Sequence, residues 1–164
     1  MRARHAVLAV FYLAISALGA MAQGTSLAFG QTGFNDKEPI EIVSDSIEMN
    51  QSDGRVVFQG NVVVAQGSLR LSAGRIDVIY GEDRTKIDSL TASGGVTVVT
   101  NGEAAEAKNA VYSVTNRLIE MRGDVLVSQG PTALSGDLMT IDLERGNAKM
   151  EGRVKTILNP GTVE

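Results

Sequence analysis

From Ile40 onward, apolar and polar residues alternate with a period of two, and helical spacing is nearly absent. The apolar positions are rich in Val, Ile, Leu and Thr, and Gly, Asn, Asp and Ser separate the short runs. Runs of this kind, bounded by turn residues, are typical of an all-β protein with antiparallel strands. We expect strands over residues 39–43, 46–50, 54–59, 61–66, 68–72, 75–80, 86–92, 95–100, 103–107, 109–114, 117–121, 124–129, 132–135, 137–143, 147–151 and 153–158.

Four glycines mark an internal repeat: Gly60, Gly94, Gly123 and Gly152, spaced by 34, 29 and 29 residues. Apolar residues or Thr lie two and four positions before and after each glycine, and a polar residue or Gly follows it directly. This alternation turns one face of a strand–bend–strand unit inward, and the glycine supplies a bend or bulge. The pattern predicts a folded-over stack of two sheets with open ends, whose lumen is lined by the same position of every unit.

The third element of each unit has a clear inner phase except in the last unit. Ile76 and Val78 alternate after Arg75, and Ala110 and Tyr112 alternate after Asn109. If Asp137 takes the place of Arg75 in the last unit, Leu138 and Thr140 face inward, whereas the opposite phase carries Met139, Ile141 and Leu143. The inner face of this unit therefore stays open.

The predicted lumen is lined mostly by small aliphatic side chains and has few aromatic ones. Such a lining forms either a closed core or a slot that suits acyl chains, and the pattern alone allows both. The candidate lumen residues are Phe58, Val62, Val64, Ile76, Val78, Val96, Val98, Tyr112, Val125 and Val127.

The first and last strands of the stack are expected to be exposed edges, which offer unpaired backbone groups to a matching strand. We expect the last strand of one molecule, or of an upstream partner, to pair with the first strand of the next. The alternative is that both are ordinary edges, protected by flanking prolines and charges such as Lys155. The candidate edge residues are Ile40, Ile42, Val154, Thr156 and Leu158.

The N-terminus predicts a cleaved secretory signal peptide over residues 1–22. Arg2 and Arg4 precede the apolar segment 6–19, and Ala20-Met21-Ala22 forms an A-x-A cleavage site. An uncleaved anchor is the rival interpretation, although the apolar segment falls short of the ~20 residues of a membrane span. We further expect a flexible leader over 23–37, one domain over 38–160 and a tail over 161–164.

Composition narrows the range of functions. The chain has no Cys, and its single His, His5, lies in the predicted signal peptide, so the usual Ser-His-Asp, Cys-His and His-metal sites are excluded from the mature chain. Removing Arg2 and Arg4 from the 15 basic residues leaves 13 against 19 acidic residues, a net charge of −6. This balance argues against a nucleic-acid partner. We expect a binding protein with no catalytic residues, no metal and no cofactor.

Several short motifs add a family resemblance. Pro39-Ile40-Glu41-Ile42, the run Val57-Phe58-Gln59-Gly60-Asn61-Val62, Gln66-Gly67 and Ala73-Gly74-Arg75 occur in this order. Over about residues 38 to 160 the chain resembles the OstA-like domain family of LptA-type lipopolysaccharide-transport proteins. The family often has Ala-Asp-Lys where this chain has Ala73-Gly74-Arg75. This chain therefore lacks the aspartate of that motif, and no role is assigned to the position.

The resemblance implies a β-jelly roll with open ends that carries the acyl chains of lipopolysaccharide in its lumen. It also implies head-to-tail homo-oligomers in the periplasm that bridge the inner and outer membranes. The implied partners are lipopolysaccharide, an LptC-like inner-membrane component and an LptD-like outer-membrane component.

Three other functions remain open from the sequence. An LptC-like protein shares the fold but keeps an N-terminal anchor. The repeats also allow a structural or glycan-binding exported β-repeat protein. A glycosidase needs two carboxylates flanking its substrate, and the candidate acids are Asp77, Glu82, Asp83, Asp137 and Asp142.

Overall fold

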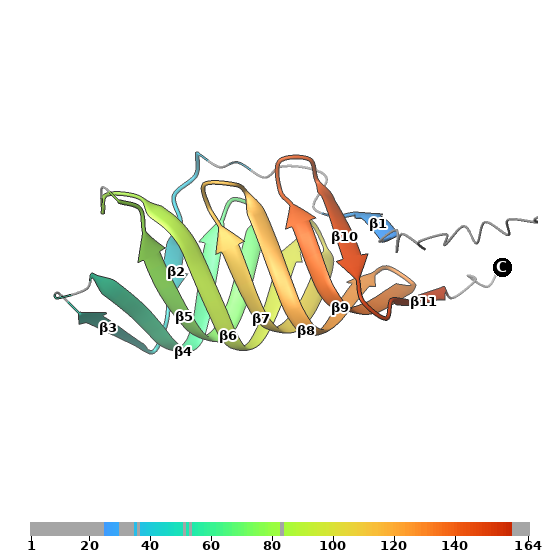
Figure 1. The fold of residues 1–164 in the computed structure, drawn as a ribbon, viewed down its shortest axis with the longest axis horizontal. Coiled ribbons are helices and arrows are strands. Elements are labelled where there is room, and N and C mark those ends of the chain that lie inside the picture. The colour runs from blue at the N-terminus through green and yellow to red at the C-terminus, as the bar shows by residue number, and fades with distance from the viewer. Residues whose placement is uncertain are drawn as a thin grey trace, which may run out of the picture.

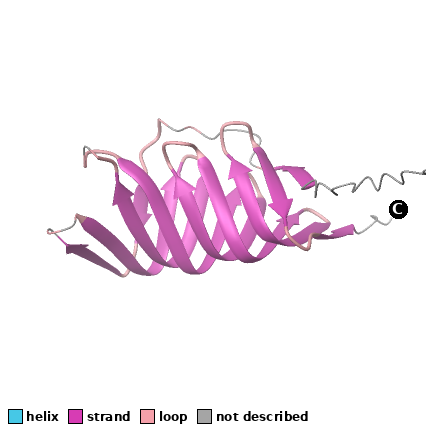
Figure 2. Cartoon of the chain, in the orientation of Figure 1, coloured by secondary structure: helices cyan, strands magenta, loops and turns pink. Residues whose placement is uncertain are grey.

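The computed structural model describes residues 25–29, 35, 37–50, 52, 54–82 and 84–158, and every regular element in these ranges is a β-strand (Figures 1 and 2). One antiparallel sheet of 11 strands has the order β1-β10-β9-β8-β7-β6-β5-β4-β2, with β11 paired to β9 and β3 to β4. The all-β, antiparallel prediction is confirmed. No helix in the described ranges is long and apolar enough to cross a membrane. The strands are β1 (Thr25–Ala28), β2 (Glu41–Val43), β3 (Ser46–Asn50), β4 (Arg55–Gln66), β5 (Leu69–Tyr80), β6 (Ile87–Thr100), β7 (Glu103–Ser113), β8 (Leu118–Gln129), β9 (Thr132–Asp142), β10 (Asn147–Glu151) and β11 (Lys155–Leu158).

The long strands β4 to β9 each join two of the predicted short strands through a bend. At the bend the pairing register shifts, because one strand contributes more residues than its neighbour. Three of the repeat glycines occupy these positions, and Gly152 lies at a similar bend between β10 and β11; all four have φ between +76° and +83°. The residues that follow them also have positive φ: Asn61, Gly95, Asp124 and Arg153. Because a bulge of this kind bends a strand, the whole sheet folds over along the line of bends.

The bends divide the sheet into two facing layers. Figure 1 shows one layer behind the other, joined along the lower edge of the view. Half-sheet A contains β2, β11 and residues 62–66, 69–73, 96–100, 103–107, 125–129 and 132–136. Half-sheet B contains β1, β3, β10 and residues 55–59, 75–80, 87–93, 109–113, 118–122 and 138–142. The predicted folded-over architecture is thus confirmed.

The first and last bends have the same geometry. The Asp45 N–H donates to the carbonyl oxygen of Gly60 (2.9 Å), and the Asp137 N–H donates to that of Gly152 (3.0 Å). The side chains pair as well, since the Asn61 amide donates to Asp45 Oδ2 at 2.8 Å and Arg153 Nη2 donates to Asp137 Oδ1 at 2.6 Å. Both ends of the sheet therefore repeat one structural unit.

The prediction of a flexible leader over 23–37 is wrong for residues 25–29. Thr25–Ala28 form β1, which pairs antiparallel with β10. Phe29, which follows it, is only 1% exposed and belongs to the core. The leader residues pair here because β10 offers an otherwise open edge, and Phe29 gains apolar burial. The predicted signal peptide lies outside the described residues.

The structure also settles the inner face of the last unit. Met139, Ile141 and Leu143 are buried, whereas Leu138 and Thr140 are not. The bend residue of β9 is Asp137, which corresponds to Gly74 of β5 and not to Arg75. Of the two phases that the sequence left open, the one with Leu138 and Thr140 inward is therefore excluded, because it is shifted by one residue and moves every side chain to the other face.

Candidate functional site

The inner faces of the two half-sheets form one continuous apolar lining. Nine of the predicted lumen residues are buried there: Val62, Val64, Ile76, Val78, Val96, Val98, Tyr112, Val125 and Val127. The tenth, Phe58, is partly buried and packs against the same cluster. The structure therefore places all ten on the predicted face and brings them together. The inner side chains of the two layers belong to one cluster of buried residues.

Sequence reasoning left many lining residues out of the candidate set. Leu90, Ala92, Ile119 and Met121 follow the repeat phase and were available from the pattern. The β9 residues belong to the last unit, whose inner face the sequence left open. The other members are Val56, Leu69, Leu71, Ala73, Ala105, Ala107, Ala110, Leu134, Met139, Ile141, Leu143, Ala148 and Met150.

One buried hydrogen bond crosses between the layers. Tyr112 in half-sheet B donates its hydroxyl proton to Gln66 Oε1 in half-sheet A at 2.7 Å. The Gln66 amide in turn donates to the carbonyl oxygen of Glu38, which precedes β2 (3.1 Å). The pair therefore ties the two layers together near the β4–β5 turn, where the layers are no longer joined by bends.

We predict that Tyr112→Phe lowers the free energy of unfolding by about 1 kcal/mol, because a buried acceptor loses this donor. Chemical denaturation followed by circular dichroism measures the loss. Tyr80→Phe is the matched control, since the Tyr80 side chain is exposed and its change should have no effect. Equal stability of both variants would show that the cross-layer bond contributes nothing.

The two ends of the lining differ. At the β10 end, Phe29 and Met150 are fully buried. At the β3 end, the inner-phase side chains of Ile47 and Met49 are 55% and 66% exposed. One end of the lining is therefore covered by the chain's own N-terminal residues, and the other presents apolar side chains to solvent.

The predicted edge residues lie on the edges of half-sheet A. Ile40 and Ile42 are partly buried against the core, and Ile42 pairs with Val64. At the opposite edge, Thr156 is exposed and pairs with Leu134, and Val154 is exposed just before β11. Leu158 pairs with Thr132 through its backbone, but its side chain lies outside the described set. Pairing with another molecule stays a prediction.

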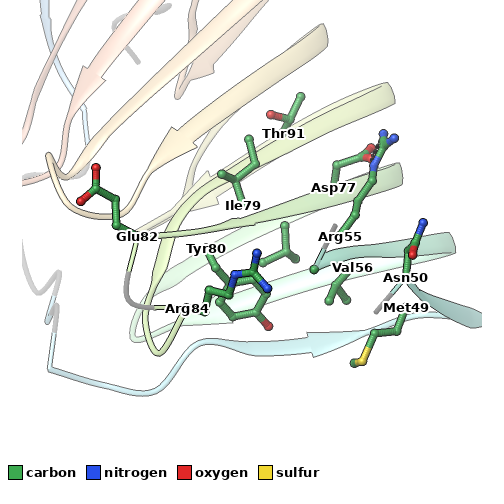
Figure 3. A pocket seen from close by; sticks show the side chains of 13 residues that line it. Met49, Asn50, Arg55, Val56, Asp77, Ile79, Tyr80, Glu82, Arg84 and Thr91 are labelled. Carbon is green, nitrogen blue, oxygen red and sulfur yellow. Dashed lines mark hydrogen bonds and ion pairs between the residues drawn. The ribbon is translucent and has the colours of Figure 1, made fainter. Parts of the chain in front are cut away.

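A surface hollow of about 1060 Å³ lies at the exposed β3 end, where Val56 and Val78 of the lining contribute to its wall. Met49, Tyr80 and Arg84 contribute to its wall (Figure 3). Arg55 from β4 and Asp77 from β5 also lie in it side by side, with Arg55 Nε donating to Asp77 Oδ1 at 3.0 Å. The hollow combines apolar and charged side chains, whereas the lining is apolar.

Three of the five acids proposed for a glycosidase are engaged with basic groups. Asp77 accepts hydrogen bonds from Arg75 and Arg55, and the Arg75 bond, with that of Arg55, lowers its pKa. Asp137 is held by Arg153, and Asp142 accepts backbone and side-chain N–H groups of Arg145, which lower the Asp142 pKa. A general acid needs a raised pKa, so these carboxylates suit a structural role. Glu82 lines the hollow with Asp77, and Asp83 lies outside the described residues.

We predict that Asp77→Asn flattens the acid limb of the stability curve. The Asp77 pKa is lowered from its ordinary 3.8 on folding, so its contribution is present above that value and is lost as the pH falls through the folded pKa. Free energies of unfolding at several pH values below 5 measure this slope. Asp88→Asn is the control, because Asp88 is exposed and accepts its side-chain hydrogen bond from the Thr115 hydroxyl rather than from an arginine. An unchanged slope in Asp77→Asn would contradict the assignment.

Comparisons with known proteins agree with this architecture. Residues 41–147 match the family described as LptA/(LptD N-terminal domain) LPS transport protein. An uncharacterized protein of Rhizobium meliloti is 30% identical over 90% of this chain and 89% of its own length. The lipopolysaccharide export system protein LptA of Haemophilus influenzae is 28% identical over 77% of this chain and 80% of its own.

A solved structure shares the fold. The crystal structure of LptH, the LptA-homologous periplasmic component of the lipopolysaccharide transport device of Pseudomonas aeruginosa, superposes with a TM-score of 0.68 at 19% identity. The match covers 77% of this chain and 99% of LptH. With the family match over residues 41–147, these likenesses show that the chain belongs to the LptA/(LptD N-terminal domain) LPS transport protein family.

Proposed function

We propose that this protein binds the acyl chains of lipopolysaccharide between its two half-sheets and carries the lipid across the periplasm. The observation that supports this most is the chemistry of the lining. Of the buried residues that the structure describes, only Gln66 and Thr100 are polar, and none is charged. Acyl chains need a long apolar surface and offer no polar group to pair. Membership of an LPS transport family supports the choice of lipid.

Binding requires the two layers to move apart. The bends join them along one side, and the Tyr112–Gln66 hydrogen bond connects them near the other. Acyl chains that enter between the layers replace apolar contacts between Val, Leu, Ile and Met side chains with similar contacts to lipid. Little apolar surface is exposed by this exchange, so its cost in the hydrophobic term is small. The sugar and phosphate groups stay in water, because burying them unpaired is costly.

We also propose that the molecules stack head to tail and act without catalysis. The edge at β2 and β3 receives either an LptC-like inner-membrane component or another copy, and the edge at β11 contacts another copy or an LptD-like outer-membrane component. The LptH described above is itself a periplasmic component of such a device. Exposed apolar side chains at the edges support these contacts. A hydrolytic activity on glycans that is lost on changing one Asp or Glu would contradict the non-catalytic role.

Photo-crosslinking tests the lipid site. A benzophenone amino acid replaces Phe58, whose partly buried ring lies on the inner face. Matched controls replace Thr97 and Arg70, which lie on outer positions of β6 and β5. We expect only the Phe58 variant to label lipopolysaccharide, and we expect native mass spectrometry to find this lipid with protein purified from the periplasm. Equal labelling at all three positions would refute the inner-face site.

The remaining functions predict different outcomes of the same work. A structural or glycan-binding β-repeat protein copurifies with no lipid and labels none from Phe58. An LptC-like component retains its N-terminal residues, which the mass of the exported protein reveals. Either result would replace the proposed function.

A further inference from the structure

Strand β1 occupies a position at one end of half-sheet B that has no counterpart in half-sheet A. Its residues pair with β10 alone. Counted over the described residues, half-sheet A has eight strands, from β2 to β11. Half-sheet B has eight strands from β3 to β10, and β1 is the ninth. With about 4.8 Å between neighbouring strands, β1 makes this layer one strand wider than the other.

Strand direction decides what the extra strand does to stacking. β3 runs antiparallel to β4, β1 runs antiparallel to β10, and β4 and β10 run the same way because alternate strands of the sheet do. A second copy placed beside β1 therefore presents its β3 parallel to β1, which breaks the antiparallel pattern. Placed directly beside β10, the same β3 is antiparallel. In half-sheet A, β2 of the second copy is already antiparallel to β11.

The pairing register of β1 on β10 is the same as that of β3 on β4. Gly60 and Gly152 occupy equivalent bends, so Val56 of β4 corresponds to Ala148 of β10. Met49 pairs with Val56, and Leu27 pairs with Ala148. Leu27 thus lies on β10 where Met49 lies on β4. By the same count, Thr25 takes the place of Ile47, so both inner-phase positions of β3 are matched.

We propose that β1 is an intramolecular substitute for β3 of a second copy of this chain, and that it leaves β10 when the copies stack. This inference rests on the proposed head-to-tail assembly. It adds the step by which the β10 edge becomes free to pair with a second copy. Its occupant is a second copy because the register, the direction and the apolar inner positions of β3 all match the edge that β1 covers. Ile47 and Met49, largely exposed in the single molecule, become buried by the exchange.

Two further features of the edges fit this exchange. The translation that places β3 beside β10 puts Asp45 of the second copy next to Gly152 and Arg153. The Arg153 side chain is 85% exposed and can face this carboxylate as well as Asp137. The release of β1 also withdraws Phe29 from the end of the apolar lining. The lining of one molecule then continues into that of the next, as transfer of an acyl chain between copies requires.

A disulfide that locks β1 onto β10 tests the exchange. Leu27 and Ala148 are directly opposed in an antiparallel pair, where Cα atoms lie about 4.5–5.5 Å apart, within the range of a disulfide. The native chain has no Cys, so Leu27→Cys with Ala148→Cys forms one defined bond. Sedimentation velocity over a concentration series compares the oxidised and reduced forms. We expect oxidation to weaken self-association by about tenfold or more, since the competent state is no longer populated.

A second variant weakens β1 instead. Leu27→Ala with Phe29→Ala removes the apolar contacts that hold β1 in place, and we expect self-association to strengthen about tenfold. Added to this variant, Ile47→Lys should abolish association, because it places a charge on the inner phase of β3. Val111→Lys is the matched control, since Val111 is also an exposed apolar residue but lies on the central strand β7.

The outcomes separate the two proposals. If the oxidised and reduced forms associate equally while Ile47→Lys abolishes association, head-to-tail stacking stands and the displacement of β1 is refuted. If Ile47→Lys and Val111→Lys behave alike, or if no variant associates, both stacking through β3 and the role of β1 are refuted. Circular dichroism confirms that each variant keeps its β-sheet signal.

Discussion

Replacing Val98 with Asp is expected to lower the free energy of unfolding by several kcal/mol, a large share of the about 5–15 kcal/mol that typical domains have. Val98 lies on β6 and is 0% exposed, between apolar side chains of both layers. An aspartate there either stays charged without a partner or takes up a proton, and both states cost free energy. Denaturant unfolding followed by circular dichroism measures the loss.

Val99→Asp is the matched control, because it makes the same change one residue along the same strand. Val99 faces outward and is 37% exposed, and Arg70 is its direct neighbour on β5. We expect a change within about 0.5 kcal/mol. Similar losses in the two variants would contradict the assigned inner phase. A small loss in Val98→Asp alone would show that the space between the layers is a hydrated slot rather than a closed core.

The sequence predicted the repeating part of the fold because local chemistry encodes it. Glycine adopts positive φ without strain, so Gly60, Gly94, Gly123 and Gly152 could be recognised as bends. Alternation on both sides of each bend then identified the inner face. The same signals could not show that the short strands on either side of a bend are continuous. A bulge adds one residue to a strand without ending it, and the sequence does not show whether the extra residue lies in a bulge or in a turn.

That count is also why the sequence left the inner face of the last unit open. A bend places two residues on one strand opposite one residue on the next, and Asp137 is such a single residue. In β5 the corresponding residue is Gly74, which the sequence offered as an obvious break. Asp137 carries no such signal, so the sequence allowed either Leu138 and Thr140 or Met139 and Ile141 on the inner face. Only the pairing between strands shows which residue is unopposed.

Strand β1 could not be predicted from its own residues. Thr25–Ala28 is too short to show a period and stands in a polar segment. It becomes a strand because β10 leaves an edge open at that place, which is a property of the folded sheet. The hollow at the β3 end is likewise formed by turns and strand ends far apart in sequence, among them Met49 and Arg84. Long-range pairing decides such features, and a single sequence does not display it.

The bends themselves should respond strongly to a single methyl group. In Gly94→Ala, the new Cβ lies 3.3 Å from Gly74 Cα on the adjacent strand, and the φ of +82° is unfavourable for alanine. The neighbouring atoms belong to the backbone of β5, which is paired on both sides and yields little. We expect the free energy of unfolding to fall by about 2–4 kcal/mol, as the sum of backbone strain and overpacking.

Gly102→Ala separates these two causes. Gly102 has nearly the same φ of +83°, but a Cβ added there meets nothing within 4 Å. It should therefore lose only the conformational part, about 1–2 kcal/mol. A larger loss in Gly94→Ala shows that the strands are in tight contact along the bends, which then act as a fixed hinge while the layers part at the opposite side. Equal losses would show that β5 and β6 can shift at the bend, and the layers would then be able to separate along their whole depth.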